Sequence, residues 1–153
     1  MLLKTLSVVS LCSLFTLIFI GGYVSSSGVG LTCPNWPLCP AGLVPTYSFI
    51  IEYIHRTVAA TTALLVIITM VFTLRSKMSP RGMKISSAIA SGAAIGQISL
   101  GGAVIIERLH ATLVTTHLGL GLVMFSMTLI TVMYSYKIRH DDIKKNTLSN
   151  AAK

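Results

Sequence analysis

The sequence predicts an all-α protein, an integral membrane four-helix bundle, and three observations lead to this fold class. Hydrophobic residues make up 53% of the 153-residue chain and charged residues only 10%, and the mean hydropathy is +0.79. A soluble domain carries about 25% charged residues, so that class is excluded. The chain also contains four long stretches without Asp, Glu, Lys or Arg, and its basic residues gather between these stretches.

Each stretch is long enough to cross a hydrocarbon core, which takes roughly 20 helical residues. We expect spans at 5–24, 48–74, 85–106 and 111–136, an outer loop at 25–47 and a cytoplasmic tail at 138–153. The second span begins before its charge-free stretch, 57–74, and so includes Glu52 and Arg56 near its outer start. Backbone polar groups cannot stay unpaired in lipid, and none of the runs alternates like a barrel strand, so the spans are helices. Residues 1–137 then form one bundle. Residues 141–153 are polar without apolar periodicity, and we expect them to be irregular.

The basic residues predict the topology. The chain has 12 Lys and Arg against 4 Asp and Glu, a net charge of +8. If the chain crosses four times, all basic residues except Arg56 and Arg108 fall on one side, and both termini are cytoplasmic. The basic excess is therefore a topology signal and a contact with anionic headgroups, not a nucleic-acid footprint.

The outer loop contains two cysteines, Cys33 and Cys39, with Pro34 and Pro37 between them. On the oxidising face of a membrane, a disulfide is the expected state of such a pair. Prolines in so short a ring favour a strained bond that is easily reduced. A redox role and a structural staple both remain open. Trp36, in the same segment, is expected to be an aromatic anchor at the membrane interface.

Two histidines occupy matching positions in the expected spans. His55 lies about 8 residues, or ~12 Å, inside a helix beginning near Tyr47, and His117 about 6 residues, or ~9 Å, inside a helix beginning near Ala111. Both helices run from outside to inside, so the imidazoles suit two axial ligands of one haem iron. A lone helix histidine is more often a hydrogen-bonded interior residue. Ionisable residues within membrane spans are costly and usually functional, and this favours haem ligation.

Other polar residues accompany the histidines. Glu52 shares a helix face with His55, and Arg56 could pair with Glu52 or hold a haem propionate. Gln97 is a polar residue within the third span, where bonding to another helix and contact with a ligand are both open. His110 is expected to be solvated or interfacial, and Cys12 to be a buried apolar thiol. Zinc is disfavoured because no third ligand has a suitable spacing.

A weak internal repeat is also present. The pair Gly21-Gly22 recurs as Gly101-Gly102 at an offset of 80, and His55 recurs as His117 at an offset of 62. The offsets predict two helical hairpins related by an axis along the membrane normal. The glycine pairs would let helices approach closely or let a flat ring lie against a helix.

Five segments together resemble the haem A synthase family. They are, in order, residues 22–28, the Cys-Pro-x-Trp-Pro-x-Cys motif at 33–39, the Glu-x-x-His-Arg motif at 52–56, residues 97–104 and the His-Leu pair at 117–118. The resemblance implies an integral membrane enzyme that oxidises the C8 methyl of haem O to the formyl group of haem A, the prosthetic group of terminal oxidases. It implies stepwise oxidation through an alcohol and a geminal diol.

The resemblance also implies roles for individual residues. His55 and His117 would ligate the iron of haem b, of the substrate haem O, or of both. Arg56 and Gln97 are further candidate haem-binding residues, on the grounds given above for the residues themselves. Glu52 and a redox-active disulfide between Cys33 and Cys39 would serve catalysis.

The same resemblance bears on partners. Typical members have eight spans in two similar halves, whereas this chain has four. The resemblance therefore implies that copies of this chain assemble as a homo-oligomer in the bilayer. Haem O synthase or the terminal oxidase assembly would be further partners.

Two other functions stay open. A bis-histidine membrane cytochrome b that only carries electrons predicts bound haem b without methyl oxidation. A disulfide-linked quinone or thiol oxidoreductase predicts a Cys-x-x-Cys pair, and the sequence contains none.

Overall fold

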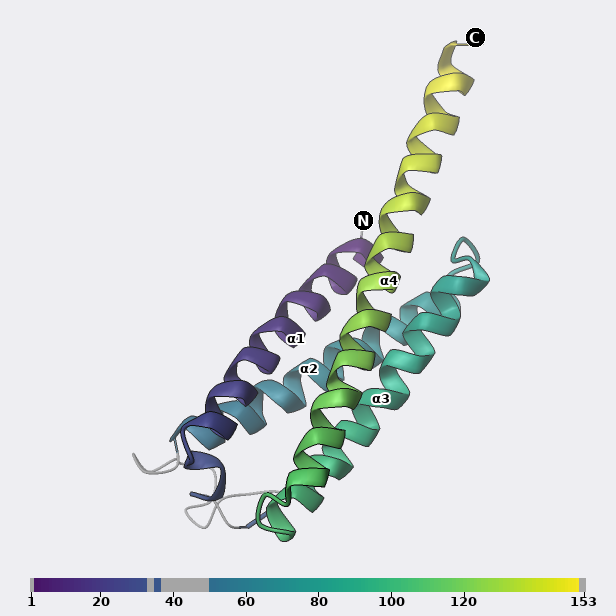
Figure 1. Cartoon of the computed structure of the whole chain (residues 1–153). Coiled ribbons are helices and arrows are strands. Elements are labelled where there is room, and N and C mark those ends of the chain that lie inside the picture. Colours follow the sequence, from purple (N-terminus) through teal and green to yellow (C-terminus); the bar gives the residue numbers. More distant parts are fainter. Residues whose placement is uncertain (1, 33–34, 37–49, 152–153) are drawn as a thin grey trace.

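The structure is a computed structural model that describes residues 2–32, 35–36 and 50–151, with side chains described up to residue 138. Its elements are α1 (Leu2–Ser26), a short 3-10 turn η1 (Val29–Leu31), α2 (Ile50–Arg75), α3 (Arg81–Ile106) and α4 (Ala111–Ala151). The described ranges contain no strand, and the all-α prediction is confirmed (Figure 1).

Four helical segments are long and apolar enough to cross a membrane, and in α4 this segment is Ala111–Ile138. The chain is therefore a multi-pass membrane protein. Helices α1 and α3 begin before the charge-free runs, and their first turns include the basic residues Lys4, Arg81 and Lys84. Such long basic side chains can keep their charge at the membrane surface while the helix continues into the lipid. The Lys4 ammonium lies 3.8 Å from the ring centre of Tyr136 at the same end of the bundle.

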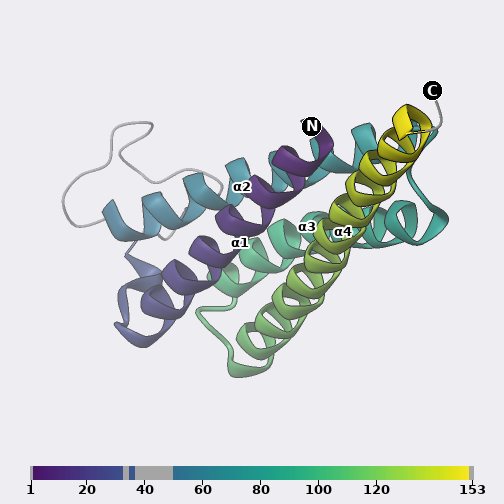
Figure 2. The same ribbon diagram turned by 90° about the horizontal axis from the view of Figure 1, so that it is seen from above.

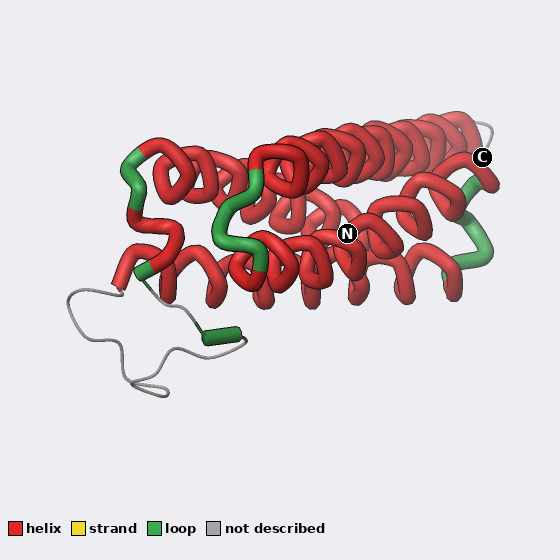
Figure 3. Tube along the Cα trace, turned by 60° about the horizontal axis from the view of Figure 1, so that its bottom comes forward, coloured by secondary structure: helices red, strands yellow, loops and turns green. Residues whose placement is uncertain are grey.

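Each helix packs against its neighbour in the chain, and α1 also packs against α4, which closes the bundle (Figures 1 and 2). The N-terminus and the α2–α3 turn lie at one end, here called the inner end. The outer end carries η1 and the α3–α4 turn (Figure 3). The assignment of the inner end to the cytoplasm stays a prediction from the basic residues.

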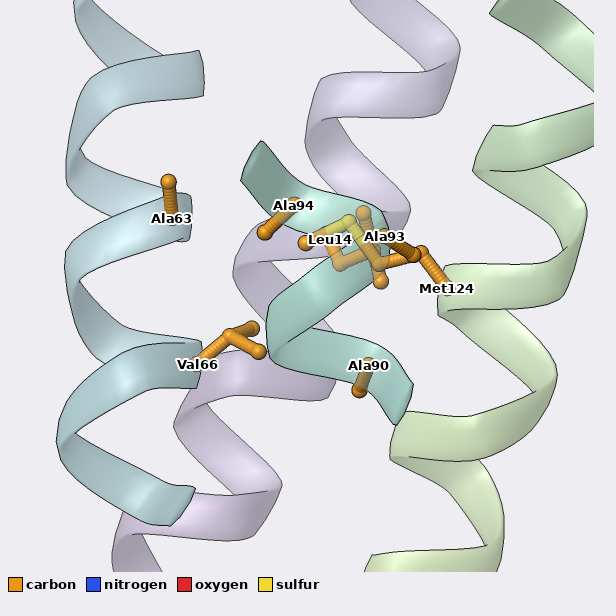
Figure 4. Close-up of a cluster of buried hydrophobic side chains, with 7 residues drawn as sticks. All are labelled: Leu14, Ala63, Val66, Ala90, Ala93, Ala94 and Met124. Atoms are coloured by element: carbon orange, nitrogen blue, oxygen red, sulfur yellow. The ribbon is translucent and has the colours of Figure 1, made fainter. Parts of the chain in front are cut away.

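Small side chains form the centre of the bundle. The hydrophobic core consists of Leu14, Ala63, Val66, Ala90, Ala93, Ala94 and Met124 (Figure 4). Hydroxyl pairs join neighbouring helices: Ser10 with Thr69 at 3.0 Å and Ser86 with Thr131 at 2.8 Å. Small residues that allow close approach and hydroxyl bonds between helices are typical of packing in lipid, where burial of apolar surface does not drive association.

Two sequence expectations are wrong. Helix α4 continues to Ala151, whereas we expected an irregular tail from residue 141. The physical reason is that no glycine or proline interrupts the chain between residues 122 and 151, so nothing ends the helix. Cys12 is a free, exposed thiol on the outer surface of α1, not a buried one. An apolar thiol is equally compatible with a surface that faces lipid.

Candidate functional site

The ring of His55 lies against a glycine of the neighbouring helix. His55 is on α2, about 5 residues or ~7.5 Å from its start at the outer end. A Cβ atom at Gly21 of α1 would come within 3.1 Å of His55 Cε1 and 3.7 Å of Nδ1. The glycine therefore provides the space for the imidazole, whose Nδ1 is buried without a hydrogen-bond partner.

His117 repeats this arrangement in the second hairpin. It lies on α4, about 6 residues or ~9 Å from the start of that helix. A Cβ atom at Gly101 of α3 would lie 3.6 Å from His117 Cε1, and His117 Nδ1 is also buried and unpaired. The contacts of Gly21 with His55 and of Gly101 with His117 follow the offsets of the predicted repeat.

In the part of the chain that the structure describes, the Nδ1 atoms of both imidazoles are buried without a hydrogen-bond partner. A buried polar atom without a partner costs about 1–3 kcal/mol, so two such atoms at similar depth need an explanation. Histidine nitrogens that are not used by the protein are the donors that a haem iron takes as axial ligands. The chemistry of the pair therefore fits a haem.

Glu52 lies one helical turn before His55, and its side chain is only 2% exposed. Both carboxylate oxygens are bound: Arg56 Nη2 donates to Oε1 at 2.6 Å and the Thr32 hydroxyl donates to Oε2 at 3.1 Å. We expected Arg56 to pair with Glu52 or to hold a haem propionate, and the structure shows the pair with Glu52. Thr32 was missed by the sequence reasoning, because a threonine 20 positions away in a loop gives no signal in helical spacing.

Residues 35 and 36 of the outer loop contact both hairpins. Arg56 Nη1 donates to the backbone oxygen of Asn35 at 2.5 Å, which ties the loop to α2. The indole of Trp36 lies over Gly102 of α3, where a Cβ atom would come within 3.2 Å of Cε2. Trp36 remains 47% exposed, so it contacts the bundle as well as its surroundings.

The remaining expected site residues have different outcomes. Cys33 and Cys39 lie outside the described residues, and their disulfide stays a prediction. The side-chain amide of Gln97 donates to the backbone oxygen of His117 at 2.6 Å, so it joins α3 to α4. His110 is exposed in the turn between these helices.

Comparison with known proteins identifies relatives. Residues 43–153 match the family model described as cytochrome oxidase assembly protein, COX15-CtaA. The chain is 27% identical over 138 residues to the haem A synthase of Bacillus licheniformis, which covers 88% of this chain and 46% of the relative. It is 28% identical over 141 residues to the haem A synthase of Staphylococcus aureus strain JH9, which covers 89% and 46%.

A third relative gives the same result. The haem A synthase of Exiguobacterium sibiricum is 29% identical over 134 residues, covering 83% of this chain and 45% of the relative. The chain thus spans less than half the length of each of these three proteins. Because the family model covers well over half of the chain, the chain belongs to the COX15-CtaA cytochrome oxidase assembly family, the family of the haem A synthases.

Proposed function

We propose that this chain is a membrane oxidoreductase that converts haem O to haem A for terminal oxidases by oxidising the C8 methyl to a formyl group. The observation that supports this most is the histidine pair at the outer end, each with a buried, unpaired Nδ1, beside a buried glutamate. The haem A synthases among its relatives support the same reaction class.

His55 and His117 would hold the iron of haem O, of haem b, or of both. The bound haem supplies the redox chemistry of its iron. The residues of this chain would fix the position of the haem, since a glycine faces each imidazole from the neighbouring helix, with the tighter spacing at Gly21. We further propose that this chain works as a homo-oligomer, next to haem O synthase or the terminal oxidase assembly.

Glu52 is proposed to take up protons released as the methyl group is oxidised, or to stabilise positive charge that develops on the oxidised carbon. Oxidising a methyl to a formyl group breaks two C–H bonds, removes electrons and adds one oxygen atom. It therefore needs an external electron acceptor and water or dioxygen, and it needs a group in the site that takes up the released protons. Among the described side chains the carboxylates are Glu52, which is buried near His55, and Glu107, which is exposed. Arg56 and Thr32 hold the Glu52 carboxylate in one orientation, and Arg56 balances its charge.

The outer loop would connect the haem site with the outer surface. We propose that a disulfide between Cys33 and Cys39 passes electrons or anchors the substrate. The contacts of Asn35 with Arg56 and of Trp36 with Gly102 support this role, because they join the loop to both hairpins.

The proposal is tested by extracting the haem from the purified protein after expression in a host that supplies haem O. Chromatography that finds haem O together with haem A supports the synthase. Haem b alone would indicate the bis-histidine cytochrome, and a protein without haem would contradict both functions. The same host carrying the empty vector gives the background amount of each haem.

A glycine substitution behind His55 tests the haem site separately. The variant Gly21→Ala is expected to weaken binding of haem b severalfold, because its Cβ would lie 3.1 Å from His55 Cε1 and must displace the ring. Titration with haem b, followed by Soret absorbance, measures the change. The matched control is Gly22→Ala, whose Cβ meets nothing within 4 Å and which should bind as the wild type does. Equal binding by both variants would show that the Gly21 contact does not position His55.

A further inference from the structure

The hydrogen bond from Gln97 to α4 ends at the residue that carries the second imidazole. Gln97 Nε2 donates to the backbone oxygen of His117 at 2.6 Å. In an α-helix this oxygen already accepts the N–H four residues later, that of Gly121, and its second lone pair is free for another donor. A Cβ atom at position 121 would lie 3.0 Å from Gln97 Nε2, so the glycine leaves the space for the amide.

Helix α3 therefore contacts His117 at two points. Gln97 binds its backbone, and Gly101, one turn further along the same face of α3, faces its ring, where an added Cβ atom would lie 3.6 Å from Cε1. The hydrogen bond fixes the height of the α4 turn relative to α3, and the glycine leaves room for the ring beside α3. Together they define the position of the imidazole relative to the neighbouring helix.

The first hairpin has no equivalent of this hydrogen bond. With the offsets of 80 and 62, the positions that correspond to Gln97 and Gly121 are Leu17 and Ala59, and neither side chain can donate a hydrogen bond. The turn that carries His55 instead holds Arg56, which binds the outer loop at Asn35. The α4 turn that carries His117 is thus bonded to another helix, whereas the α2 turn that carries His55 is bonded to the outer loop.

We infer that Gln97 is the positioning residue for His117: its amide, admitted by Gly121, holds the α4 turn so that the imidazole has one fixed position for the haem iron. This role rests on the proposed haem ligation by His117. It makes His117 the ligand whose helical turn is bonded directly to another transmembrane helix.

The test uses the full chain in detergent, reconstituted with haem b. Gln97→Met removes the donor at similar length. Gly121→Ala leaves Gln97 in place but crowds its amide, whose Nε2 would lie 3.0 Å from the added Cβ atom, and so strains the bond to the carbonyl. Each variant is expected to lose haem about fivefold faster, the effect of one lost hydrogen bond. Each should also show a high-spin fraction in the optical and electron paramagnetic resonance spectra, which added imidazole converts to low spin. The double variant should show no further change, because both substitutions break the same bond.

Two matched controls separate positioning from general stability. Gly119→Ala gains the same helix propensity on α4, but its Cβ meets nothing within 4 Å. Ser99→Ala alters an exposed hydroxyl of α3 that bonds only to its own helix. Both should keep the wild-type spectrum and rate of haem loss.

The possible results are distinct. A wild-type spectrum and rate in both Gln97→Met and Gly121→Ala overturn the inference, as does an equal effect of Gly119→Ala. The reference variant His117→Ala tests the underlying proposal: if it keeps the low-spin spectrum, haem ligation by His117 is wrong. If it loses that spectrum while the Gln97 and Gly121 variants keep it, the positioning role alone is wrong.

Discussion

Replacing Glu52 with glutamine is expected to reduce the conversion of haem O to haem A by about 10²- to 10⁴-fold, the usual contribution of a general base, while haem remains bound. Glutamine has the size of glutamate, and its amide oxygen can still accept the hydrogen bond from Arg56. Its NH2 group would then face the Thr32 hydroxyl, which can accept a hydrogen bond in place of donating one. Glutamine cannot take up a proton at neutral pH. The ratio of haem A to haem O in chromatographed extracts measures conversion, and the Soret absorbance of the same sample measures bound haem.

The chain contains a matched control for this variant. Glu107 is exposed in the turn after α3, at the same end of the bundle, and Glu107→Gln should convert haem O at the wild-type rate. Full conversion by Glu52→Gln would contradict the proton-acceptor role. Loss of bound haem from Glu52→Gln, with Glu107→Gln unaffected, would show instead that the carboxylate holds the site together.

The four spans could be predicted from the sequence because the hydrocarbon core excludes charge over a fixed thickness. Each span therefore shows as one long apolar run, which is recognised without knowing how the rest of the chain packs. The ends of the helices could not be predicted, since a helix continues through the headgroup region where charge is tolerated. Helix α3 thus begins at Arg81, although the charge-free run begins at Ile85.

The same distinction applies to the candidate site. The relation of Glu52 to His55 and to Arg56 follows from the helical period, which brings residues three and four apart onto one face. Contacts between elements carry no such signal. The bond from Thr32 to Glu52 and the space that Gly121 leaves for Gln97 depend on how the loop and helices pack, and only the structure shows them.

Replacing either histidine of the pair is expected to have the largest effect on haem binding. Removing a residue that only hydrogen-bonds to a metal ligand already lowers metal affinity about 10- to 100-fold. Removing a ligand itself should cost more, so His55→Ala and His117→Ala should each weaken binding of haem b by about 100-fold or more. Any haem that remains bound should be five-coordinate and high-spin, and added imidazole should restore the low-spin spectrum by occupying the vacated position. Haem titration with optical and electron paramagnetic resonance spectra measures both effects.

The exposed His110 provides the control, because it lies at the same end of the bundle without a place in the pair, and His110→Ala should bind haem as the wild type does. If both histidines ligate one iron, the two single variants must give the same high-spin species, and the double variant must need two imidazoles for each haem. If only one of the single variants loses the low-spin spectrum, the two histidines do not share an iron, and the pairing proposed from their matching depth is wrong. Low-spin haem in both single variants would remove these histidines from the ligand set altogether.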